Sequence, residues 1–79
     1  PLDRELKLAE AHLAGAERSL VNRNAYCDLA KQIGDEAVHV RTDAMILGLR
    51  RVIEEVRLIL RNIKALIAVR DERTEERHA

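Results

Sequence analysis

The sequence predicts an all-α fold, an antiparallel hairpin of two long helices that assembles into a multi-helix bundle or coiled-coil oligomer. Three observations carry this prediction. Apolar residues recur at alternating steps of four and three along the second half of the chain, the first half repeats that rhythm, and one Gly-Asp pair separates the halves. A four-three rhythm places side chains along one side of a helix, where neighbouring helices can cover them.

The first predicted helix runs from about residue 2 to residue 33. Its seam, the row of positions expected to face the other helix, keeps the rhythm throughout: Leu2, Leu6, Ala9, Leu13, Ala16, Leu20, Arg23, Cys27 and Ala30. The alanines in this row are small enough to let the helix axes approach closely. No proline interrupts the segment, since Pro1 is the only proline.

Gly34 and Asp35 form the predicted turn. Glycine readily adopts the left-handed conformation that ends a helix, and an aspartate directly after it can accept the free N–H groups that begin the next helix. We therefore expect the chain to reverse direction here. Residues whose numbers sum to about 69 should then lie at the same height, so that Cys27 faces Thr42.

The second predicted helix runs from residue 36 to about residue 69, and the charged C-terminal extension, residues 70–79, is either a helical overhang or disordered. Each seven-residue repeat carries three apolar positions, one more than a two-stranded coiled coil needs. This wide arc predicts homo-oligomerisation of the single 1–79 domain, as a dimer or trimer of hairpins. The expected oligomer interface comprises Met45, Leu49, Val52, Ile53, Val56, Ile59, Leu60, Ile63, Leu66 and Ile67.

A second interpretation breaks the chain twice, at residues 22–24 and at Thr42-Asp43, where Thr42 or Asp43 would cap a new helix. It would produce a three-helix bundle. The apolar rhythm passes through Thr42 without a change of phase, which favours the hairpin.

Composition limits the possible functions. With 47% hydrophobic residues, 35% charged residues and one aromatic residue, the chain has the profile of long packed helices. Fourteen basic and fourteen acidic residues cancel, so the broad positive charge of a general nucleic-acid binder is missing. A chain of 79 residues buries little apolar surface by itself, which makes self-association the expected remedy.

The sequence also gives an expectation for the cellular compartment of the protein. A single cysteine excludes an intrachain disulfide, and the start lacks the charged and apolar regions of a signal peptide. The longest uncharged apolar run of the second half, residues 44–49, is far shorter than the roughly 20 residues of a membrane span. We expect a soluble, cytoplasmic protein with no membrane partner.

Cys27, His39 and Asp43 should lie near one another beside the turn. These residue types could serve as nucleophile, base and orienting carboxylate. A helix seam offers no oxyanion donors, however, because its backbone N–H groups are already bonded within the helix. The sequence therefore predicts no enzyme and no catalytic residue, but a packed cysteine, a half-exposed histidine and a surface aspartate with Arg23 in reach.

Ligand sites are not indicated either. Zinc commonly takes three or four protein ligands, and Cys27, His39 and His12 do not recur at His-x-x-x-His or Cys-x-x-Cys spacing. Arg50 and Arg51 are each followed four residues later by a glutamate, a pattern typical of a solvated, paired helix face. We expect no metal, cofactor, small molecule or nucleic acid.

The sequence thus predicts a structural module whose activity is homo-oligomerisation. The alternative is a natural adaptor or regulatory domain that presents the Ala-rich face of the first helix to a partner helix. Two equal arms with a minimal turn are also typical of a designed protein, in which eleven arginines to three lysines and a free cysteine would be unusual.

Overall fold

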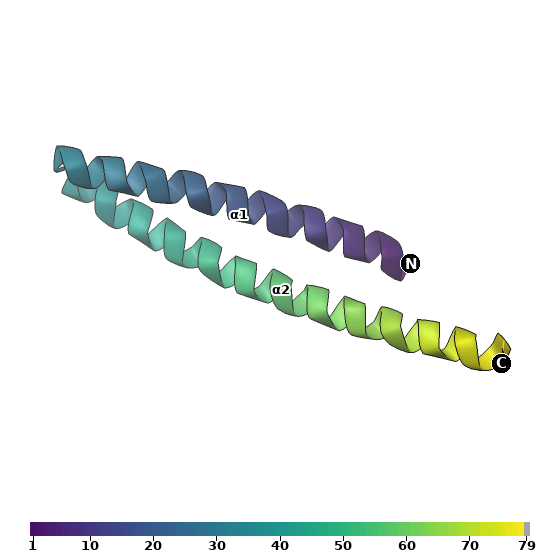
Figure 1. Ribbon diagram of the computed structural model, residues 1–79. Coiled ribbons are helices and arrows are strands. Elements are labelled where there is room, and N and C mark those ends of the chain that lie inside the picture. The colour runs from purple at the N-terminus through teal and green to yellow at the C-terminus, as the bar shows by residue number, and fades with distance from the viewer. Residues whose placement is uncertain (79) are drawn as a thin grey trace.

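The computed structural model describes residues 1–78 as two antiparallel helices, α1 (Leu2–Ile33) and α2 (Glu36–His78), packed side by side (Figure 1). The predicted helical hairpin is confirmed, and α1 has the predicted bounds. The Cα trace spans 66 × 15 × 14 Å, so the molecule is a rod. Its length is that of α2, whose 43 residues correspond to about 65 Å at 1.5 Å per residue. Ala79, the end of the predicted domain, lies outside the described residues.

The turn has the predicted chemistry. Gly34 lies in the left-handed region with φ 77° and ψ 20°. Its N–H donates to the carbonyl of Lys31 (3.2 Å), and the N–H of Asp35 donates to that of Ala30 (3.0 Å), the two bonds of a Schellman motif. The Asp35 carboxylate then accepts the N–H of Val38 (3.2 Å), which caps the first turn of α2.

Both helices run unbroken through residues 22–24 and 42–43, so the three-helix interpretation is wrong. Thr42 does not cap a helix there. Its buried hydroxyl donates to the Val38 carbonyl oxygen (2.8 Å) one turn earlier in α2, which satisfies the polar atom locally. The charged extension is helical as far as residue 78, and α2 continues past the N-terminal end of α1 as an overhang (Figure 1).

The predicted seam of α1 is buried or half-buried at every position except Arg23. Arg23 is exposed and its neighbour Asn24 is half-buried. The physical reason is that a guanidinium group stays hydrated unless it is paired, whereas a shorter amide tolerates the edge of a seam. The tightest packing lies near the turn, where Cys27, Ala30 and Thr42 are each 3% exposed.

The wide apolar arc of α2 is divided in the structure. Two of its rows face α1 and are buried or half-buried: Thr42, Leu49, Val56 and Ile63, and Ile46, Ile53, Leu60 and Ile67. We call the second of these the inner row. The third row has no covering element within the described chain.

Candidate functional site

The uncovered third row, which we call the outer row, consists of Met45, Val52, Ile59 and Leu66. These side chains are 43%, 38%, 50% and 55% exposed. They recur every seven residues, so they form one straight stripe beside the seam rather than scattered surface positions. Contiguous exposed apolar surface is uncommon on folded proteins that act alone, which makes this row a candidate contact surface.

The ten residues expected to form an oligomer interface therefore have two different surroundings. Six pack against α1 within the same chain: Leu49, Ile53, Val56, Leu60, Ile63 and Ile67. The other four are the outer row. Their spacing was visible in the sequence, but which rows α1 would cover depends on the rotation of α2 about its own axis.

The opposite edge of the seam is charged. Arg50, Arg57 and Lys64 recur there at seven-residue steps, and Arg57 lies 3.5 Å from Glu17 of α1, guanidinium nitrogen to carboxylate oxygen. The expected pairing of Arg50 and Arg51 with the glutamates four residues on does not occur among residues 1–78. One edge of α2 beside the seam is therefore charged, and the other edge is apolar.

The face of α1 that points away from the seam is also partly apolar. Leu8, Val21 and Leu29 are more than half exposed, and alanines 11, 14 and 25 are exposed beside them. This is the Ala-rich face that the sequence singled out. It is shallower than the outer row, because most of its members are small.

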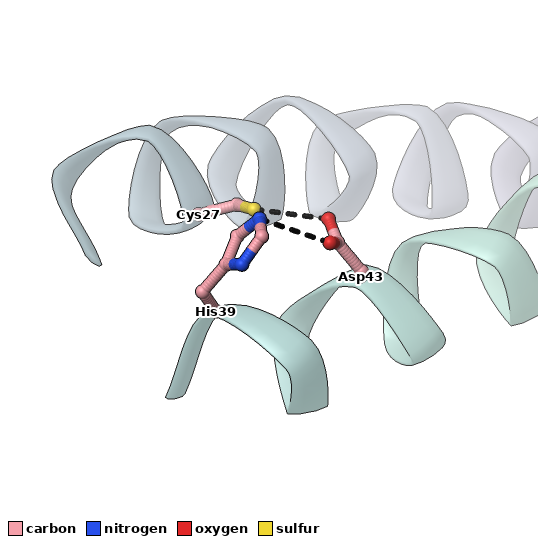
Figure 2. A group of neighbouring side chains, drawn as sticks. All are labelled: Cys27, His39 and Asp43. Carbon is pink, nitrogen blue, oxygen red and sulfur yellow. Dashed lines mark hydrogen bonds and ion pairs between the residues drawn. The ribbon is translucent and has the colours of Figure 1, made fainter. Parts of the chain in front are cut away.

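Cys27 of α1 and His39 and Asp43 of α2 converge between the helices next to the turn (Figure 2). The Cys27 thiol donates a hydrogen bond to Asp43 Oδ1 (3.2 Å), and His39 Nε2 lies 3.0 Å from Asp43 Oδ2. Cys27 is buried, His39 half-buried and Asp43 exposed. The expected proximity is confirmed, but the neighbours of Asp43 are Cys27 and His39 rather than Arg23.

The electrostatics of this cluster centre on the thiol. Burial raises the pKa of Cys27, and its hydrogen bond to Asp43 and the negative charge of that carboxylate raise it further, while Lys31 acts in the opposite direction. The thiol is therefore protonated at neutral pH and acts as a hydrogen-bond donor. A reactive cysteine needs the opposite, a depressed pKa with solvent access.

An open surface pocket of about 370 Å³ lies against the cluster. Cys27 and Asp43 form part of its wall, together with Asn24, Lys31 and Arg50. The buried thiol thus has a small solvent-facing approach from one side of the hairpin.

Comparisons with protein-family models, curated proteins and solved structures found no match to this chain. Within residues 1–78, neither helix contains an apolar stretch long enough to cross a lipid bilayer.

Proposed function

We propose that this protein is a homo-oligomerisation module in which the outer rows of separate chains pack against one another. The observation that carries the proposal is the exposed stripe of Met45, Val52, Ile59 and Leu66, which continues the apolar arc of the hairpin seam without a gap. A solvent-exposed row of this kind gains free energy when it is covered, because apolar surface leaves water.

The expected occupant is a second copy of the same chain. A helix that covers the outer row needs apolar side chains with the same seven-residue period, and the outer row itself has that period. Two rows related by a two-fold axis perpendicular to α2 run antiparallel, which would place Met45 opposite Leu66 of the other chain and Val52 opposite its Ile59. Two hairpins paired in this way form a four-helix bundle.

The incomplete core of the hairpin supports the same proposal. No side chain in the described part of the chain is less than 2% exposed, because two helices cannot enclose a residue from all sides. Chains of this size are marginally stable alone, and oligomerisation is one of the usual ways to extend a small core.

Sedimentation equilibrium over a dilution series tests the proposal. We expect wild-type protein to exceed the single-chain mass, and the double variant Val52→Glu/Ile59→Glu to fall to that mass while remaining helical by circular dichroism. The matched control is Leu47→Glu/Leu58→Glu, which changes two leucines on the other side of α2 that are 53% and 52% exposed. A wild-type protein of single-chain mass at every concentration, or equal loss of mass in both double variants, would contradict the proposal.

The second candidate is an adaptor that binds a partner helix through α1. The exposed Leu8, Val21 and Leu29, set among alanines, favour it, since a shallow apolar face accepts a closely packed helix. A wild-type protein that stays helical at single-chain mass would favour the adaptor over the oligomer.

A further inference from the structure

We propose that Cys27, His39 and Asp43 bind a divalent transition-metal ion of the zinc type, held between α1 and α2 beside the turn. The site lies at the turn, away from the middle of the outer row, and it is complete within one chain. The proposal therefore does not rest on oligomerisation.

The donor set suits such an ion. A cysteine sulfur, a histidine nitrogen and an aspartate oxygen are the three kinds of protein ligand that zinc takes. One ligand atom from each of the three residues lies within 4.8 Å of the other two. With metal–ligand bonds of about 2.0–2.3 Å, ligand atoms of a tetrahedral site lie about 3.2–3.8 Å apart. The distance from Cys27 Sγ to Asp43 Oδ1, 3.2 Å, lies at the lower end of that range, and the distance from His39 Nε2 to the other carboxylate oxygen, Asp43 Oδ2, is slightly shorter at 3.0 Å.

A second observation that supports a metal site concerns the surroundings of His39 Nε2. This nitrogen atom is shielded from solvent, although the His39 side chain as a whole is 28% exposed, and Asp43 Oδ2, 3.0 Å away, is not in hydrogen-bond geometry with it. Buried side-chain nitrogens are normally hydrogen-bonded, and one that is not calls for a specific explanation such as an ion. A metal at this point would accept the nitrogen lone pair and the carboxylate together.

The backbone holds the three ligands in place. His39 and Asp43 are four residues apart, so they project from the same face of α2. Metal sites on helices use the same spacing for pairs of histidines, and here an aspartate takes the second position. Cys27 approaches from α1, whose height is fixed by the hydrogen bonds of Gly34 and Asp35 only a few residues away.

The charges balance in the bound state. Binding replaces the S–H bond of Cys27 with a metal–sulfur bond and releases the proton to solvent, since the thiolate is the ligand. The thiolate and the Asp43 carboxylate together offset the two positive charges of the ion. Three protein ligands leave a fourth position, and the pocket beside Cys27 and Asp43 gives water access to it.

Cobalt(II) titration of the reduced, metal-free 79-residue protein tests the site. We expect visible d–d bands of tetrahedral cobalt and a near-ultraviolet sulfur-to-metal charge-transfer band, both removed by added Zn²⁺, with one ion bound per chain. The affinity for cobalt should fall in His39→Asn and in Asp43→Asn. The fall should exceed the roughly 10–100-fold that typically follows loss of a residue hydrogen-bonded to a metal ligand. Cys27→Ser should lose the charge-transfer band.

The control is His12→Asn, which removes an exposed histidine of α1 outside the cluster and should leave cobalt binding unchanged. Circular dichroism without metal checks that each variant is folded. If Cys27→Ser does not fold, the cobalt affinities of His39→Asn and Asp43→Asn decide whether the site exists. The proposal is wrong if the wild-type protein gives no charge-transfer band. It is equally wrong if one ion binds per two chains with unchanged affinity in His39→Asn and Asp43→Asn, because two cysteines would then be bridging.

Discussion

The inner and outer rows of α2 are similar in chemistry and opposite in surroundings. Ile46, Ile53 and Leu60 of the inner row are 7%, 4% and 6% exposed, whereas each outer-row neighbour one residue earlier is 38% or more exposed. The helix and the residue types are common to both rows, so the difference comes from α1, which covers only part of the arc. Apolar periodicity thus defines the surface that needs a partner, and it does not say which surface the same chain will cover.

The adjacent pair Ile53 and Val52 gives the largest test of this difference. Ile53→Ala removes a buried side chain from the hairpin and should lower the free energy of unfolding by about 2–5 kcal/mol. Val52→Ala, measured at a concentration where the chains are separate, should change it by no more than about 0.5 kcal/mol, as exposed substitutions usually do. Urea denaturation followed by circular dichroism measures both.

Equal losses in these two variants would mean that the outer row is as buried as the inner row even in isolated chains. The proposed oligomerisation adds a second expectation: raising the protein concentration should make Val52→Ala, and not Ile53→Ala, more destabilising relative to wild-type protein.

Two glycines, Gly34 at the turn and Gly48 inside α2, give the next largest effects on stability, with opposite signs. Gly34 has a left-handed backbone conformation, in which a residue with a Cβ is strained. Gly34→Ala should therefore lower the free energy of unfolding by roughly 1–2 kcal/mol. Gly48→Ala lies in the middle of α2 with nothing within 4 Å of the added Cβ, and should stabilise the helix by about 0.5–1 kcal/mol. Thermal unfolding at low concentration reports both. A stabilising Gly34→Ala would show that the turn does not set the position of α1.

The smallest effect concerns the open end of the hairpin, where Arg70 lies 3.1 Å from Asp3, nitrogen to carboxylate oxygen. The hydrogen bond and charge of Arg70 lower the pKa of Asp3 below its ordinary value. The ion pair therefore stabilises the folded state above about pH 4, the usual aspartate value, and this contribution is lost as the pH falls through the lower folded pKa. The difference in unfolding free energy between wild-type protein and Asp3→Asn should shrink below that pH.

Glu5→Gln is the control for this pH effect, because Glu5 shares the first turn of α1 and its favourable position near the helix N-terminus without contacting Arg70. If the difference in unfolding free energy between wild-type protein and Glu5→Gln shows the same pH dependence, the effect comes from the helix dipole and not from the ion pair. High salt should reduce the Asp3 effect, since exposed charges are screened.

The sequence predicts the hairpin itself almost completely, because the signals for the helices and the turn are local. Gly34 and Asp35 specify the turn through their own backbone preferences, and the four-three rhythm specifies the faces of both helices. Arg23 shows the limit of the rhythm, since a position with the right spacing can still turn to solvent when its side chain is charged. The overhang beyond residue 69 lacks apolar periodicity, so its helical state could not be chosen from the pattern.

The candidate sites are less accessible to sequence reasoning. The register rule predicted that Cys27, His39 and Asp43 lie close together, but it did not predict that the Cys27 thiol donates a hydrogen bond to Asp43 Oδ1. Such contacts depend on side-chain conformations, which the spacing of residues along the helices does not specify. The outer row could not be separated from the seam because both have the same period, and only the rotation of α2 against α1 distinguishes them.

The Schellman turn at Gly34 also has a consequence for the order in which we expect the chain to fold. Contacts beside the turn close short loops, such as the 16 residues that separate Cys27 from Asp43, whereas Asp3 and Arg70 at the open end are 67 residues apart. Loop-closure entropy rises with this separation, and proteins built from local contacts fold quickly. We expect the helices to join from the turn outward, so that the cluster beside the turn forms early and the Asp3–Arg70 pair closes last.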